Sequence, residues 1–329
     1  MIEVKHLTKR YGNHTAVSDL SFTIKKGQIY GFLGPNGAGK STTMNIMTGC
    51  LAATSGEVKI GGYDIFEESR QAKKLIGYLP ELPPVYPDRT PREYLTFVAR
   101  AKGIPERQIP MELESVMAVT QTGDVADRLI KNLSKGYRQR VGIAQALLGN
   151  PEVIILDEPT VGLDPRQIIE IREMIQRLGE DHTVILSSHI LSEVQAVCQT
   201  IMIIAKGKLV ACDTPENLEK LFAGTATVEL TVAASEEETR RILAQVKGIT
   251  DLEIQSGENR CLVKVSSDRA ADDSLCEDIF FAFSHAQRAI LQMTMAKATL
   301  EDIFMELTDS GDEKQELLEA EEEEEAENK

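Results

Sequence analysis

The stretch Gly34–Thr43 constrains this chain more than any other. It contains the spacing Gly-x-x-x-x-Gly-Lys-Ser, which is typical of a loop that wraps around phosphate groups. A short apolar run over 28–33 precedes it and a segment without helix breakers, 41–48, follows it. The loop is therefore predicted to join a buried strand to a helix, with backbone N–H groups and the positive helix end facing an anion. This context favours a nucleoside triphosphate site over a glycine-rich turn with no ligand.

Within this loop we expect a division of roles. The Lys40 ammonium is predicted to reach the β- and γ-phosphates, and the Ser41 hydroxyl is predicted to bind Mg²⁺. The predicted contacts to the nucleotide come from Gly34, Pro35, Asn36, Gly37, Ala38, Gly39, Lys40, Ser41 and Thr42.

The net charge of −16 is concentrated at one end of the chain. Residues 312–329 hold ten acidic residues against two lysines, which gives −8 and predicts a solvated, disordered tail. A basic surface of the kind that binds nucleic acid is not indicated.

Five scattered cysteines suit a reducing cytosol. The sequence shows neither an apolar run long enough for a membrane span nor the apolar core of a signal peptide, so we expect a cytoplasmic protein.

Two further apolar runs end in chemically useful residues. Val153–Leu156 is followed by Asp157 and Glu158, as expected of a central parallel strand with acids at its carboxyl end, where ligands bind. The run over 182–187 is followed by Ser188 and His189. A solvated corner would also explain the acids, and a lone histidine is more often structural. Because both groups fall at the same predicted sheet edge, we favour a shared site.

Taken in order, these motifs resemble the ATP-binding subunit of an ABC transporter over about residues 2–222. The resemblance implies that Asp157 holds Mg²⁺ through water and that Glu158 is the general base. It also implies that His189 contacts the γ-phosphate and that Asp164 communicates across a dimer. Tyr11 matches the aromatic residue that stacks on adenine, although a tyrosine half packed at a strand end would look the same.

The segment Leu133–Tyr137 matches the family's signature motif with two departures, Lys135 and Tyr137. Ser134 and Gly136 are retained, and Ser134 also fits the N-cap of the following helix. In the family this motif acts on the ATP held by the opposite subunit. The resemblance therefore implies a head-to-tail dimer with two ATP, whether homodimeric or heterodimeric.

Glu81 stands where the family usually has glutamine. A carboxylate can bind Mg²⁺ but cannot donate a hydrogen bond as an amide can, and nearby phosphates disfavour its ionised form unless metal is present. In having a glutamate at position 81 and the altered signature, the chain resembles the branch of the family whose permeases are of the ABC-2 type. We expect Glu81 to keep a metal-sensing role.

The expected fold is an α/β P-loop NTPase over 1–222, with a RecA-like core, an antiparallel β subdomain and a helical subdomain over about 84–150. Residues 226–308 show the order βαββαβ, which predicts a small ferredoxin-like α+β domain. Its role is open between regulation, dimer contact, ligand sensing and simple stabilisation. Residues 309–329 form the acidic tail.

The resemblance implies an ATPase that powers a separate permease at the inner face of the membrane, and branch resemblance implies export. The Pro-rich loop 82–87 and the helices after it are where such subunits grip the permease. The alternative is a non-transport ABC ATPase of the DNA-repair or ribosome-associated type. DNA-repair types need a long coiled-coil insertion between Lys40 and Ser134, and ribosome-associated types carry two cassettes. The sequence shows neither feature.

Overall fold

The computed structural model describes residues 1–222, 226–257, 260–267, 273–296 and 304. The described chain divides into two compact units, which meet in sequence between Thr214 and Pro215. We expected residues 215–222 to belong to the ATP-binding domain, but they form the helix α8 (Pro215–Phe222) and group with the second unit. Of the described helices, none is both long and apolar enough to cross a bilayer.

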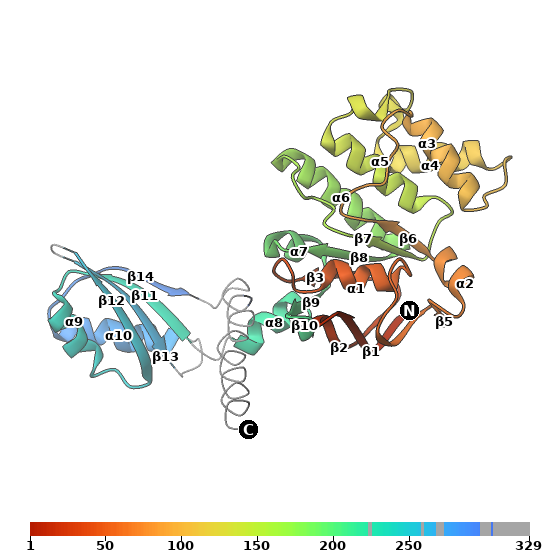
Figure 1. Cartoon of the computed structure of the whole chain (residues 1–329). Helices are drawn as coiled ribbons and strands as arrows, with labels where there is room; N and C mark the ends of the chain where they lie inside the picture. Colours follow the sequence, from red (N-terminus) through yellow and green to blue (C-terminus); the bar gives the residue numbers. More distant parts are fainter. Residues whose placement is uncertain (223–225, 258–259, 268–272, 297–303, 305–329) are drawn as a thin grey trace, which may run out of the picture. The chain divides into compact units, whose positions relative to one another are not determined.

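A six-stranded sheet forms the centre of the first unit, in the order β10-β9-β3-β8-β7-β6. All of its neighbouring strands are parallel except β10 and β9. Every residue of β3, β7 and β8 is buried, because helices cover both faces, as predicted for these apolar runs (Figure 1). The strands are β3 (Ile29–Leu33), β6 (Ile76–Leu79), β7 (Val153–Leu156), β8 (Thr183–Ser188), β9 (Thr200–Ala205) and β10 (Lys208–Asp213).

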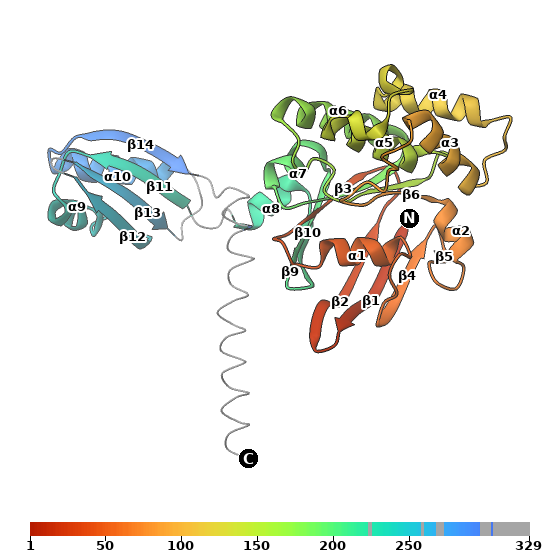
Figure 2. The same cartoon turned by 45° about the horizontal axis from the view of Figure 1, so that its top comes forward.

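The helix α1 (Lys40–Met47) lies between this sheet and a second, antiparallel one (Figure 2). One apolar core joins all three layers, and it includes the edge-to-face pair of Phe22 and Phe32, whose ring centroids are 5.4 Å apart. The second sheet has the order β2-β1-β4-β5, from β1 (Ile2–Tyr11), β2 (His14–Ile24), β4 (Ser55–Ile60) and β5 (Tyr63–Asp64).

The helices α6 (Pro165–Asp181) and α7 (Leu191–Val197) also pack on the central sheet. Gly31 makes the approach of α7 possible, since a side chain at this position would collide with Val194 and Cys198. Sequence patterns did not indicate α7, α8 or α2 (Ser69–Lys74). These helices have only six to eight residues, too few to establish a helical period.

A helical block lies between β6 and β7 in the chain. It contains α3 (Pro91–Ala101), α4 (Ile109–Thr120) and α5 (Lys135–Leu147), with short 3₁₀ turns at Gly123–Val125 and Ile130–Asn132. Thr90 and Glu93 form a capping box that starts α3, and the Ser134 hydroxyl accepts from the Tyr137 N–H at the start of α5. At the other end of α5, the Lys102 ammonium donates to the carbonyl oxygens of Gln145, Ala146 and Leu148.

The second unit has the element order β11-α9-β12-β13-α10-β14 after α8. Its four strands form an antiparallel sheet in the order β12-β13-β11-β14, the arrangement of a split βαβ fold. The elements are β11 (Ala226–Val232), α9 (Glu236–Leu243), β12 (Ile249–Ser256), β13 (Cys261–Ser267), α10 (Asp273–His285) and β14 (Ile290–Ala296). Residues 297–303 and 305–329, which include the acidic tail, lie outside the described residues.

Candidate functional site

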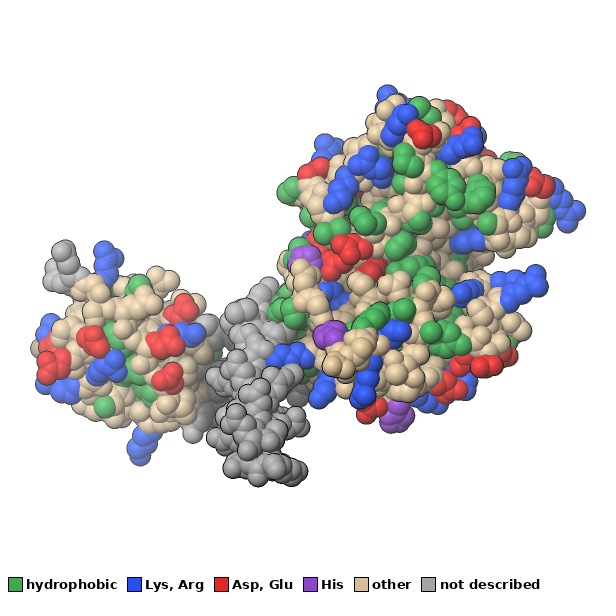
Figure 3. Space-filling model, in the orientation of Figure 1, with side chains coloured by type: hydrophobic (Ala, Val, Ile, Leu, Met, Phe, Trp, Pro, Cys, Tyr) green, Lys and Arg blue, Asp and Glu red, His purple; other side chains and the backbone are tan. Residues whose placement is uncertain are grey.

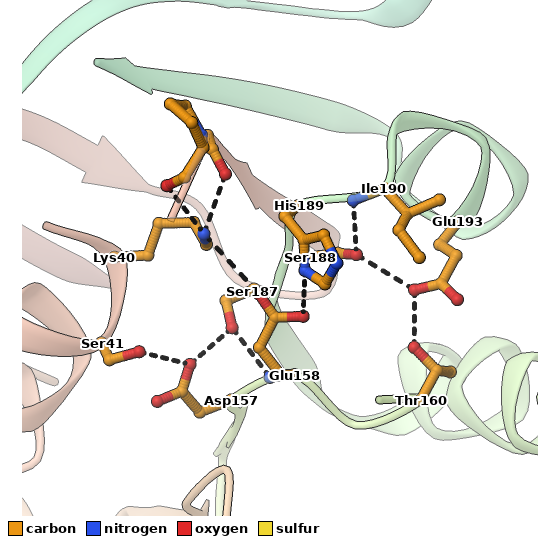
Figure 4. A network of polar contacts seen from close by, with 12 residues as sticks. Lys40, Ser41, Asp157, Glu158, Thr160, Ser187, Ser188, His189, Ile190 and Glu193 are labelled. Carbon is orange, nitrogen blue, oxygen red and sulfur yellow. Dashed lines mark hydrogen bonds and ion pairs between the residues drawn. The ribbon is translucent and has the colours of Figure 1, made fainter. Parts of the chain in front are cut away.

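Four parallel strands bring the predicted site residues to one sheet edge. The phosphate-binding loop follows β3, Asp157 and Glu158 follow β7, His189 follows β8, and Glu81 lies just past β6. Because β3, β8 and β7 are adjacent in the sheet, residues far apart in sequence meet there (Figure 4). This is the carboxyl edge at which ligands bind in open α/β sheets.

The loop is held in a conformation that only glycine adopts easily. Gly37 and Gly39 have positive φ angles of 84° and 102°, and a Cβ on Gly39 would lie 2.5 Å from the Ala16 carbonyl oxygen. Lys40 folds back over the loop, and its ammonium donates to the Gly34 and Pro35 carbonyls at 2.8 and 3.3 Å. Since α1 begins at Lys40, the N–H groups of its first turn lack intrahelical partners and face the site.

Asp157 is the buried anchor of the site, with 2% of its surface exposed. Its Oδ1 accepts from Ser41 Oγ at 3.2 Å and from Ser187 Oγ at 2.6 Å. Ser187 in turn accepts the Glu158 N–H at 2.8 Å, so one hydroxyl links both acids to β8. Ser187 is not among the residues predicted from the sequence, and the only signal for it is a hydroxyl residue at the end of an apolar strand.

Glu158 lies between two cationic or titratable groups. Its Oε1 is 3.6 Å from Lys40 Nζ, and its Oε2 is 3.0 Å from His189 Nδ1. The side chains of Lys40 and Glu158 are both almost fully buried. Glu158 also has a left-handed backbone, with φ of 48°, which is unfavourable for a residue with a side chain. The surrounding contacts therefore fix an intrinsically strained position.

A pocket of about 520 Å³ opens over these groups. The loop, Tyr11, Glu81, Glu158 and His189 contribute to its walls, as predicted from sequence. Tyr11 is 48% exposed, and Lys9 Nζ lies 5.0 Å from its ring centroid. Three lining residues were not predicted: His14, Ala16 and Val161. No sequence motif marks these three, since they depend on how β2 and the loop after β7 pass the pocket.

Some predicted residues do not line this pocket in the described chain. Gly34, Pro35 and Ala38 belong to the loop beside it, and Asp157 lies beneath it as the partner of Ser41. The others are Ser134, Gly136 and Asp164. Asp164 caps α6 by accepting the Arg166 and Gln167 N–H groups at 3.1 and 3.0 Å. Gly136 lies directly against Gln167, so the starts of α5 and α6 are neighbours. Nearby, the Tyr137 hydroxyl donates to Asp124 at 2.7 Å and helps to hold the start of α5.

Tyr78 connects the strand before Glu81 to two helices. Its hydroxyl donates to Asn45 Oδ1 at 3.2 Å on α1, and its carbonyl accepts from Gln145 on α5. Burial, and secondarily the charge of Asp157, raises the pKa of Tyr78, so that its hydroxyl stays protonated. The position of Glu81 is thereby tied to both the phosphate-binding loop and the helical block.

The donor set fits Mg²⁺. Ser41 and Asp157 place two oxygen donors together, and the Glu81 carboxylate lines the same pocket. Within the described residues, no three histidine, cysteine or acidic side chains converge on a metal position. Mg²⁺ needs only a few protein ligands when substrate phosphates complete its coordination shell.

Comparisons with known proteins point in the same direction. Residues 17–161 match the protein family described as ABC transporter. The chain is 32% identical over 312 residues to the linearmycin resistance ATP-binding protein LnrL of Bacillus subtilis, covering 94% of this chain and 98% of that protein. It is 34% identical over 314 residues to the bacitracin transport ATP-binding protein BcrA of Bacillus licheniformis, with the same coverage.

Solved structures give a similar result. An ATP-binding subunit of an ABC transporter superposes with a TM-score of 0.62 at 29% identity, over 68% of this chain and 93% of that one. The dimeric bacterial ABC transporter cassette MJ0796 gives a TM-score of 0.60 at 26% identity, over 65% of this chain and 98% of that one.

Proposed function

Since this chain belongs to the ABC transporter family, as an ATP-hydrolysing subunit of the ABC-2-type exporter branch, we propose how its residues share the reaction. The observation that carries the proposal is the single pocket that joins the phosphate-binding loop, Glu158 and His189. In this pocket the loop amides and Lys40 hold the triphosphate, and Tyr11 stacks on the adenine. The signature and Asp164 act elsewhere, as described below.

Ser41 and Asp157 would hold Mg²⁺, with Glu81 as a third oxygen ligand. When bound, the ion would neutralise charge on the phosphate oxygens. Asp157 suits this role because Ser187 already fixes its Oδ1. A buried carboxylate held by hydroxyl donors stays in one orientation, which lowers the cost of ordering it when the nucleotide arrives.

Glu158 is the proposed general base for hydrolysis. A base must lie within hydrogen-bond reach of the attacking water, and its carboxylate faces the same pocket as the phosphate-binding loop. His189, 3.0 Å from Glu158 Oε2, orients this carboxylate and contacts the γ-phosphate. Asp157 and Glu158 are adjacent yet serve different purposes. The Asp157 carboxylate contacts Ser41 and Ser187. The Glu158 carboxylate contacts Lys40 and His189.

A second ATP-binding subunit completes the site in this proposal. Ser134 and Gly136 lie at the start of α5 and outside the pocket, with Asp164 at the start of the neighbouring α6. Two helix N-termini side by side favour a negatively charged ligand. We propose that they close over the ATP of the partner subunit, whether that subunit is a second copy or a related chain.

The membrane partner is proposed to bind the helical block. Three aromatic rings cluster there: Tyr86 lies 5.6 Å from both Tyr94 and Phe97, measured between ring centroids. Tyr86 in the Pro-rich loop and Phe97 on α3 remain about half exposed. Hydrophobic side chains are visible on the surface of the helical block (Figure 3). A permease segment with an apolar knob fits such a surface. This contact would place the chain at the inner face of the membrane.

The names of the relatives suggest a class of cargo. They include bacitracin transport, lantibiotic transport and linearmycin resistance proteins. We propose that this chain powers the export of an antimicrobial compound of comparable kind. The identity of the cargo depends on the permease, which makes the substrate contacts.

Co-purification with the permease tests the partner proposal. Replacing Tyr86 and Phe97 together with alanine is expected to reduce recovery of the chain with membranes at least fivefold, while isolated-chain ATPase stays unchanged. The matched control is Phe281→Ala on α10, where the side chain is similarly exposed at 55%. Equal membrane recovery of the double variant and the wild type would argue against this docking surface.

A further inference from the structure

Glu193 is a buried acid that the proposed reaction does not use directly. It lies on α7 with 6% of its surface exposed, and it does not line the nucleotide pocket. Its Oε2 accepts two hydroxyl hydrogen bonds, from Thr160 Oγ1 at 2.5 Å and from Ser188 Oγ at 3.0 Å. Burying a carboxylate is unfavourable unless such donors compensate for the lost water. The unfavourable free energy of burying this carboxylate indicates that Glu193 has a role other than packing.

The two hydroxyl residues flank the proposed reaction groups. Thr160 lies two residues after Glu158, and Ser188 immediately precedes His189. Ser188 Oγ also accepts the Ile190 N–H at 3.0 Å, which fixes the turn after His189. One carboxylate oxygen therefore ties the loop after β7 to the loop after β8, as Figure 4 shows.

This link between the two loops holds the strained backbone of Glu158 and the distance between Glu158 and His189. Glu158 has a left-handed backbone, and its carboxylate must stay near His189. Ser187 holds the strand side of this turn through the Glu158 N–H, and Thr160 holds its far side through Glu193. Without the second anchor, the turn could relax toward a more ordinary φ angle and move the carboxylate.

We infer that Glu193 is a positioning residue for ATP hydrolysis, which sets the separation between Glu158 and His189. The inference rests on the proposed roles of those two residues. Because Glu193 contacts neither the phosphate-binding loop nor the pocket, it should act on turnover and leave nucleotide affinity alone. A merely structural acid would affect stability without this selectivity.

Steady-state kinetics of the full-length chain test the inference. Glu193→Ala should lower kcat at least tenfold, with the affinity for a fluorescent ATP analogue unchanged within twofold. Glu193→Gln keeps an oxygen that can accept both hydroxyls, so it should recover part of the lost turnover. Thr160→Val should lower kcat in the wild type and have little further effect in the Glu193→Ala background. The matched control, Glu173→Ala on the exposed face of α6, should behave as wild type.

Wild-type kcat in Glu193→Ala would overturn the inference, as would a loss of nucleotide affinity equal to the loss of kcat. Absence of any recovery in Glu193→Gln would also contradict it. These outcomes differ from failure of the proposed function itself, for which Glu158→Gln would hydrolyse ATP normally. An inactive Glu158→Gln together with a fully active Glu193→Ala would remove only the role of Glu193.

Discussion

Lys40 and Glu158 form a buried ion pair, with 3.6 Å between Nζ and Oε1. Lys40 is the cation proposed to hold the phosphates, and Glu158 is the base proposed to act on the attacking water. The triphosphate must therefore compete with the Glu158 carboxylate for the Lys40 ammonium. Binding of ATP would turn Glu158 from a partner of Lys40 into a carboxylate that can accept a proton from water. Substrate binding and activation of the base are linked through this pair.

Loss of Lys40 should therefore affect binding first. Lys40→Met removes a charge-assisted contact to phosphate, which is worth about 1.5–3 kcal/mol, so ATP affinity should fall about tenfold to a hundredfold. Titration with a fluorescent ATP analogue measures this directly. Lys26→Met is the matched control, because Lys26 pairs with Glu152 on the exposed surface. Unchanged affinity in Lys40→Met would place the phosphates elsewhere.

Glu81 predicts an unusual dependence on Mg²⁺. A carboxylate near phosphates is favoured only when a cation balances the charge, whereas an amide is neutral. Glu81→Gln should therefore shift the Mg²⁺ concentration required for half-maximal ATPase and alter transport. Titrations of ATPase against Mg²⁺, for variant and wild type in parallel, provide the measurement. If the Mg²⁺ dependence, ATPase and transport all stay the same, Glu81 has no metal-sensing role.

We expect Lys102 to make the free energy of unfolding depend on pH. Its ammonium lies against the last carbonyls of α5, and burial lowers its pKa from 10.5 to about 8, with Glu112 acting in the opposite direction. Between these values the unfolded chain binds more protons than the folded one, so this group makes stability rise with pH from about 8 to 10.5.

In Lys102→Met this contribution is absent. The free energy of unfolding in urea, measured at several pH values across that window, should rise more steeply for the wild type than for the variant. Lys131→Met serves as the control, since Lys131 pairs with Asp88 on the surface and should leave the slope unchanged. Parallel slopes for wild type and Lys102→Met would rule out titration of Lys102 as the cause.

Local patterns were sufficient to predict which residues meet at one edge of the sheet. Asp157, Glu158 and His189 each follow an apolar run, and a parallel sheet must bring the carboxyl ends of such runs to one edge. The glycine spacing and the flanking segments were enough to predict the phosphate-binding loop between a strand and a helix. The predicted core strands of the first unit and the βαββαβ element order of the second unit are present in the structure. Both were predicted from local hydrophobic periodicity.

The contacts between these residues could not be predicted in the same way. The roles of Ser187 and Glu193 depend on β8 lying between β3 and β7, and strand order is not encoded in any local pattern. The ion pair of Lys40 with Glu158 likewise occurs at a left-handed backbone position of a non-glycine residue, which sequence propensity disfavours. Strained positions at functional sites are where local reasoning is expected to fail.

The variant Glu158→Gln tests whether Glu158 activates water in a site that two subunits share. The neutral amide cannot accept the proton and competes less for Lys40, so hydrolysis should fall at least a hundredfold while ATP affinity holds or rises. Size-exclusion chromatography with ATP and Mg²⁺ should then show a stable dimer, which Ser134→Ala in the same background should weaken. Normal hydrolysis by Glu158→Gln, or a variant that binds ATP and stays monomeric, would contradict the account.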